Sequence, residues 1–265
     1  MSSTKPPHAK TTGLTSLGCY AAVLGNCDGG PLSREHYISE KLLKRFPKTF
    51  TTEGLSWTDG PRNVSPSALT AKVLCERHNS ALSPLDNMIG DLYDVLAAAH
   101  AGRDVGTHVF IGADLERWAI KVLLGLIVSG NFFGKDGQQT PVPERYVRIL
   151  FGEEELPEGC GFFYIGDPVE GLDADLLDVA INRYPPNHPE AGSIFGITIR
   201  LPSFQFVTTV TCRLQVDKQR LYYRPRGFQL GEPERGRVGL IWRPPVPNIG
   251  LVLKMPPISS KQEGA

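Results

Sequence analysis

Two short segments of this chain gather residue types that bind metal ions and move protons. In the first, Cys27 opens a glycine-rich turn, and the segment ends in the pair Glu35-His36. The second reads Cys75-Glu76-Arg77-His78-Asn79. Zinc in proteins takes four ligands, usually thiolate sulfurs and imidazole nitrogens in a tetrahedron. The chain offers one such set, and these are the predicted zinc ligands: Cys19, Cys27, Cys75 and His78.

The order of these features is typical of a treble clef. A cysteine lies in a turn, a short strand ends in Glu-His, a loop follows, and a C-x2-H pair opens a helix. Over roughly residues 19–90 this pattern resembles the HNH (ββα-metal) endonuclease family. The resemblance implies that His36 is a general base, and that Glu35 and Asn79 hold a catalytic Mg²⁺ or Mn²⁺. It also implies that the zinc ion is structural.

The implied roles agree with elementary chemistry. Cleavage of a phosphodiester needs an activated water, and an imidazole with a pKa near neutrality is a suitable base. A carboxylate and an amide offer hard oxygen ligands, which suit Mg²⁺, whereas thiolates suit zinc. We therefore expect His36 to act beside one divalent ion at Glu35 and Asn79, separate from the zinc ion.

The chain departs from the family pattern at two places. Seven residues separate Cys19 from Cys27, where a C-x2-C pair is usual, so either the turn is enlarged or Cys19 is not a ligand. The middle Asn of the pattern is missing, because Thr70 and Ala71 occupy that stretch and the nearest upstream Asn is Asn63.

Each site residue also has a simpler explanation. The cysteines can be buried thiols, and His36 and His78 can be ordinary structural or surface histidines. Asn79 can be a helix cap, a role that Asn favours. Basic residues near the site can contact phosphates or merely lie in solvent, and the predicted substrate-binding residues are Arg34, Lys41 and Lys44.

The bulk composition is that of a soluble protein without a strong preference for polyanions. The 265 residues contain 28 basic and 28 acidic side chains, so the formal net charge is zero. This balance leaves room for a local basic face. The five cysteines are odd in number, and the polar N-terminus lacks a signal peptide. We expect a cytoplasmic protein without a membrane segment.

The remaining sequence predicts an α+β fold in which the zinc-supported ββα motif is followed by a helix and a mostly antiparallel β-rich domain. A helix should follow Cys75, with Pro84 in its first turn, and end near Gly102. A second helix is expected at residues 113–132. The predicted strands are 147–151, 161–165, 176–182, 193–201, 204–214, 221–226 and 238–242.

These elements suggest four regions: a flexible leader (1–13), an HNH-like domain (14–105), a helix with a β-rich domain (106–256) and a disordered tail (257–265). The expected function is a metal-dependent DNA endonuclease, and the resemblance adds bacterial or phage defence as a setting. Two alternatives stay open: a non-catalytic zinc treble-clef binding module, and an RNA-cleaving toxin of the same fold. The β-rich domain is expected to bind a protein partner or to mediate self-assembly.

Overall fold

The computed structural model describes most of the chain between residues 12 and 254. The described residues are 12–46, 49–131, 142–166, 177–201, 204–211, 214, 221–231, 234–242 and 252–254. The predicted tail at 257–265 and nearly all of the predicted leader lie outside them.

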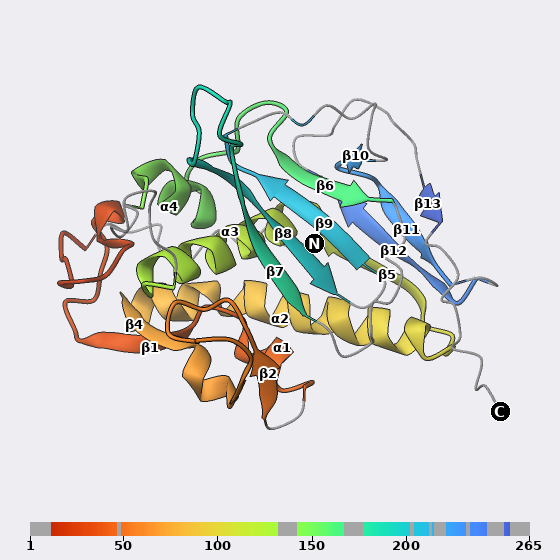
Figure 1. The fold of residues 1–265 in the computed structure, drawn as a ribbon, viewed down its shortest axis with the longest axis horizontal. Coiled ribbons are helices and arrows are strands. Elements are labelled where there is room, and N and C mark those ends of the chain that lie inside the picture. Colours follow the sequence, from red (N-terminus) through yellow and green to blue (C-terminus); the bar gives the residue numbers. More distant parts are fainter. Residues whose placement is uncertain are drawn as a thin grey trace. The chain divides into compact units, whose positions relative to one another are not determined.

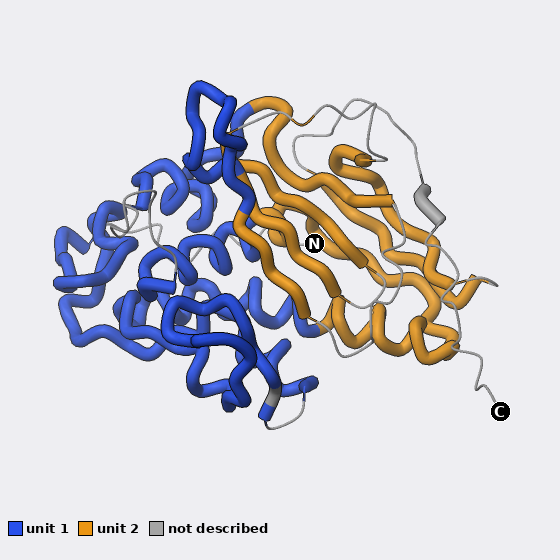
Figure 2. The backbone as a smooth tube through the Cα atoms, in the orientation of Figure 1, with its two compact units in different colours: residues 1–90, 117–157, 182–195 blue, residues 91–116, 158–181, 196–265 orange. Residues whose placement is uncertain are grey.

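Two compact units divide the chain, and each is assembled from three separate segments (Figure 2). Unit 1 comprises residues 1–90, 117–157 and 182–195, and unit 2 comprises residues 91–116, 158–181 and 196–265. The boundary that the sequence suggests, between residues 105 and 106, falls inside the first segment of unit 2. The four predicted regions stay a prediction.

The candidate site is built on a β-hairpin and a helix in unit 1. Strand β1 (Leu32–His36) pairs antiparallel with β4 (Thr70–Cys75), and α2 (Glu76–His100) follows β4 without a connecting residue (Figure 1). The pairing has a bulge at Ser33/Arg34, after which the register is regular. This ββα order is the one that the treble-clef pattern predicts.

The start of α2 differs from the prediction. Pro84 is the ninth residue of the helix and lies outside its first turn. A carboxylate from another segment caps the helix, because Asp28 Oδ2 accepts a 3.0 Å hydrogen bond from the Arg77 backbone N–H. Such a cap satisfies an N–H that has no partner within the helix. The residues around Pro84 do not indicate that the helix begins at Glu76 with a cap from a distant segment.

The other elements of unit 1 are short, apart from α3. The loop expected after Glu35-His36 contains a small hairpin and a 3₁₀ turn. The stretch 147–151 is predicted to be a strand, but residues 147–150 belong to a helix and Phe151 is its C-cap. The face of this helix toward the core is formed by Tyr146, Val147, Ile149 and Leu150. The elements are η1 (Ala22–Leu24), α1 (Glu40–Leu43), β2 (Phe50–Thr52), β3 (Arg62–Val64), η2 (Pro66–Leu69), α3 (Gly112–Val128) and α4 (Glu144–Leu150).

Helix α3 confirms the helix predicted at residues 113–132 but ends at Val128, and residue 132 lies outside the described residues. Trp118 and Leu123 are among its fully buried side chains. The helix packs closely on the exit of β1, because a Cβ at Gly125 would lie only 2.4 Å from the Cβ of Tyr37. No side chain larger than hydrogen fits there.

Unit 2 carries most of the β structure, in two sheets. A five-stranded sheet has the order β10-β6-β9-β8-β7, in which β10–β6, β6–β9 and β9–β8 pair antiparallel. A four-stranded sheet has the order β13-β11-β12-β5, with parallel pairs at both ends. The strands are β5 (Gly106–Ile111), β6 (Gly161–Ile165), β7 (Asp178–Arg183), β8 (Ile194–Leu201), β9 (Phe204–Thr209), β10 (Leu221–Tyr223), β11 (Gly227–Leu230), β12 (Gly236–Ile241) and β13 (Val252–Lys254).

Helices and antiparallel pairs together make this an α+β fold, as predicted. The core of unit 2 is aromatic: Phe162 stacks on Phe206 with ring centroids 4.9 Å apart, and Phe204 meets Phe228 edge to face at 5.0 Å. Among the described residues, no helix combines the length and the apolar character that a bilayer span requires.

Candidate metal centre and its surroundings

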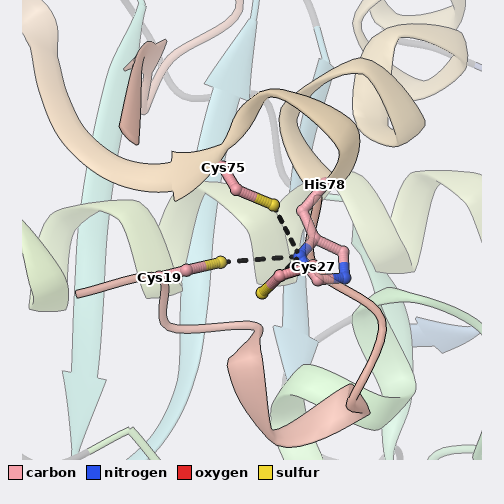
Figure 3. Close-up of side chains that lie close together, drawn as sticks. All are labelled: Cys19, Cys27, Cys75 and His78. Carbon is pink, nitrogen blue, oxygen red and sulfur yellow. Dashed lines mark hydrogen bonds between the residues drawn. The ribbon is translucent and has the colours of Figure 1, made fainter. Parts of the chain in front are cut away.

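Three cysteines surround one histidine nitrogen in the interior of unit 1. His78 Nδ1 lies 3.2 Å from Cys75 Sγ, 3.4 Å from Cys19 Sγ and 3.8 Å from Cys27 Sγ (Figure 3). All four side chains are buried, and their ligand atoms lie within 4.8 Å of one another. The structure thus brings together the four ligands that the sequence predicts.

These separations match the edges of a tetrahedral zinc site. With Zn–S of about 2.3 Å and Zn–N of about 2.0–2.1 Å, a tetrahedron has S···N edges of roughly 3.6 Å. The three S···N distances lie on both sides of that value. One nitrogen lone pair cannot serve three thiols at once, so hydrogen bonding alone does not explain the arrangement. The Cys3His cluster can hold a metal ion such as zinc.

Asn26 orients the histidine for this role. Its side-chain Oδ1 lies 2.6 Å from His78 Nε2, and both residues are buried. An amide oxygen only accepts hydrogen bonds, so Nε2 carries the proton and the lone pair of Nδ1 points at the three sulfurs. Metal-binding histidines usually donate their other N–H to such a partner. Asn26 is not among the predicted site residues, although it directly precedes the predicted ligand Cys27.

The enlarged spacing between the first two cysteines has a structural basis. A 3₁₀ turn, η1, occupies the intervening residues and ends at Gly25, whose φ of 66° is left-handed. The backbone N–H of Cys27 then bonds to the carbonyl of Leu14. Of the two alternatives, the enlarged turn is the one observed, and Cys19 belongs to the cluster.

The cluster has the electrostatics of a cation site. Burial, with the neighbouring Cys75 and Cys27 thiolates, raises the pKa of Cys19 to about 12. Three buried thiolates repel one another and lack solvation, so together they need a cation. A zinc ion, when bound, would supply that charge and hold the thiols deprotonated.

His36 lies at the C-terminal end of β1, and its side chain is half-buried. Burial lowers the pKa of His36, opposed by the negative charge of nearby Glu40. A lowered pKa leaves the imidazole neutral at pH 7, which is the state that accepts a proton.

Glu35 points the other way, into a buried network of charges. Lys121 Nζ, from α3, lies 2.5 Å from Glu35 Oε1 and 2.6 Å from Asp86 Oδ1 of α2. Ser39 Oγ donates a short hydrogen bond to the same Asp86 oxygen and accepts one of 2.7 Å from Trp118 Nε1. Lys121 is 1% exposed. Burial dominates at Glu35 and, despite Lys121, raises its pKa to about 7.

Asn79 reaches from the first turn of α2 to β1. Its Nδ2 donates to Ser33 Oγ at 3.0 Å and to the Arg34 carbonyl at 3.3 Å. It is therefore no helix cap. Asp86, seven residues later, lies on the same helical face, so the side of β1 that carries Ser33 and Glu35 faces a polar stripe of α2. An aspartate so close to a predicted helix start would be expected to cap it, but Asp86 lies in the interior of α2 and cannot.

The predicted substrate-binding residues differ in what they contact. Lys41 lies along α2, with its ammonium near the Asn87 carbonyl at 3.4 Å, and Lys44 pairs with Glu40 at 3.2 Å. Arg34 is exposed on β1. Asn63, the nearest upstream candidate for the missing middle Asn, lies on β3 and accepts a hydrogen bond from Thr51.

No protein-family model matches the sequence, and no curated protein and no solved structure matches it either.

Proposed function

We propose that this chain is a metal-dependent endonuclease of the HNH type, with His36 as general base and DNA as substrate. The observation that supports this most is where two side chains, His36 and Asn79, lie on the paired strands and the helix. His36 ends β1 with a neutral, half-buried ring, and Asn79 on the first turn of α2 contacts the same strand. These are the positions that the HNH resemblance assigns to the base and to an ion ligand.

Zinc at the Cys3His cluster would have a structural role in this proposal. Its four protein ligands leave no open position for water or substrate, which is the mark of a structural site. The ligands come from the turn before β1 and from the junction of β4 with α2. A zinc ion there joins the start of β1 to the junction of β4 with α2, where Leu32 pairs with Cys75. His36, at the other end of β1, is then held by the strand pairing.

The chemistry follows from the position of His36. Its imidazole takes a proton from a water molecule while the water oxygen forms a bond to phosphorus, and the bond from phosphorus to the leaving ester oxygen breaks. That oxygen then takes a proton from solvent. A divalent ion, when bound by Glu35 and Asn79, would stabilise the negative charge on the phosphate. This requires the buried Glu35 carboxylate to turn to the side of β1 that carries His36. Lys121 already neutralises Glu35, so an ion there must compete with its ammonium.

Nicking of supercoiled plasmid by the zinc-loaded protein tests the proposal, with Mg²⁺ or Mn²⁺ added. Wild type should nick, and His36→Ala should be slower by about 10²–10⁴-fold, the usual loss of a general base. His108→Ala is the matched control, because His108 is exposed on β5 and outside the hairpin. Absence of nicking by wild type, or equal rates for wild type and His36→Ala, refutes the proposed catalysis.

One observation favours the second candidate, a non-catalytic zinc binding module. The proposed ion ligand Glu35 is 5% exposed and paired with a buried lysine, an arrangement that serves packing as well as catalysis. In that case the protein binds DNA without cutting it, and His36→Ala binds as wild type does. The same plasmid, run as a mobility shift beside the nicking assay, separates the two.

A further inference from the structure

The pairing of β1 with β4 brings together two basic residues that are far apart in the sequence. Arg34 lies directly opposite Lys72, and His36 lies opposite Thr70. Alternate residues of a strand point to one side, and directly opposed residues share that side. The bulge precedes this stretch, so Arg34, Lys72 and His36 lie on one face of the hairpin.

That face is turned to solvent. Arg34 and Lys72 are exposed and His36 is half-buried, whereas Glu35, on the opposite face, is 5% exposed and paired with Lys121. A molecule approaching the hairpin from solvent therefore meets the two basic side chains and the imidazole together.

The two cations lack a carboxylate partner within the part of the chain that the structure describes. Like charges directly opposite each other destabilise a β-pair, and the hairpin holds Arg34 and Lys72 in this arrangement without an acid between them. Lys44, by contrast, is paired with Glu40. An anion placed between the two side chains would turn the repulsion into two attractions.

We propose that Arg34 and Lys72 clamp one phosphate of a nucleic-acid backbone beside His36. Arginine binds a phosphate through two parallel N–H donors and lysine adds a point charge, so together they can hold one anion from both sides. Two residues along a strand span about 6.8 Å, which is the scale of the step between successive phosphates of one strand. The clamp thus holds the phosphate next to the one that His36 attacks. This inference rests on the proposed function, because it assigns the substrate of that same site.

Salt-dependent binding tests the clamp without requiring cleavage. Labelled duplex DNA and a duplex RNA of the same sequence are titrated with zinc-loaded protein in a salt series, without Mg²⁺ or Mn²⁺, and binding is followed by fluorescence anisotropy. Each phosphate contact contributes about 0.9 to the slope of log K against log salt. Arg34→Gln and Lys72→Gln should each weaken binding several-fold and lower that slope by about one. The duplex whose binding responds in this way is the substrate class.

The matched control is Arg103→Gln, an exposed arginine after α2 and outside the hairpin, which should leave the slope unchanged. Denaturant unfolding gives an independent readout: Lys72→Gln should unfold at the same or a higher midpoint, because it removes a like-charge pair. Weaker binding by an equally stable variant excludes misfolding as the cause.

Two results overturn the clamp: a Lys72→Gln slope equal to that of wild type, or a wild type that binds neither duplex. Failure of the clamp and failure of the nuclease are distinguishable. If wild type nicks plasmid and neither variant alters its binding slope, only the clamp is wrong. If wild type binds DNA through both residues but does not nick, only the catalysis is wrong.

Discussion

Replacing Asn26 with alanine should weaken zinc binding without removing a ligand. The Asn26 Oδ1 accepts the only hydrogen bond that His78 Nε2–H can donate, at 2.6 Å and in a buried place where water does not substitute for it. A buried donor left without a partner costs about 1–3 kcal/mol. At 1.4 kcal/mol per factor of ten, this is roughly a 5- to 150-fold loss of affinity. Partners of metal-bound histidines typically contribute about 10- to 100-fold, which agrees.

The assay is a competition titration of zinc between the protein and a chromophoric chelator at neutral pH. Cobalt substitution adds a spectroscopic check, because tetrahedral sulfur-rich sites give intense visible bands. Asn26→Asp should keep the affinity, since a carboxylate oxygen accepts the same hydrogen bond. Asn63→Ala is the matched control, because Asn63 is exposed on β3, where its side chain accepts a hydrogen bond from Thr51.

Zinc binding by Asn26→Ala as tight as that of wild type would contradict the role of Asn26 in orienting His78. That result would mean that the histidine is held by packing alone, for example by Phe151, whose ring meets the imidazole edge to face at 5.1 Å. A purified wild type that contained no zinc and took up none would contradict the zinc site altogether.

Three further predictions concern the charges around the hairpin. Lys121→Met should lower the free energy of unfolding by about 3–5 kcal/mol, measured by denaturant titration, because Glu35 and Asp86 lose a buried counter-ion; an unchanged midpoint contradicts it. Burial raises the pKa of Glu35 from 4.5 to about 7, so the stability that its bound proton contributes is fully present below pH 4.5 and is lost as the pH rises through 7. Wild type should therefore lose on the order of 3 kcal/mol relative to Glu35→Gln across that window, and parallel stability curves would refute this. Asp28→Ala should cost about 1 kcal/mol at pH 7; the Arg77 and Gly30 N–H groups lower the pKa of Asp28, so this contribution is present above pH 4 and is lost as the pH falls through the lowered value. Equal free energies of unfolding for wild type and Asp28→Ala at pH 7, measured by denaturant titration, would refute the cap.

The four members of the cluster were predictable because each stands where the chain turns or a helix begins. Cysteine and histidine in those places have few roles besides metal binding. The long helix α3 was predictable too, since its apolar residues recur at helical spacing. The strand that ends in His36 was predictable only from its place between the glycine-rich turn and the loop. The stretch 147–151 was not, because a short apolar run fits a strand and a buried helix equally well. Its seven-residue helix depends on contacts made elsewhere in unit 1.

Side-chain partners that come from distant segments could not be predicted from the sequence. Asp28 caps a helix that begins 48 residues later, and Lys121 reaches Glu35 from 86 residues further along the chain. No local period or propensity encodes such pairs, because they arise only when the elements pack. The direction of Glu35, toward a lysine and away from solvent, is of this kind.

The sequence by itself determined the chemistry available: three thiols and an imidazole for a metal ion, and a histidine at the end of a strand. Only the tertiary structure decided how that chemistry is arranged. It placed Asn26 against His78, turned Glu35 into a buried ion pair and set Lys72 opposite Arg34. The physical reason is that a residue type fixes which bonds a side chain can make, whereas strand register and helix packing fix which partner it meets.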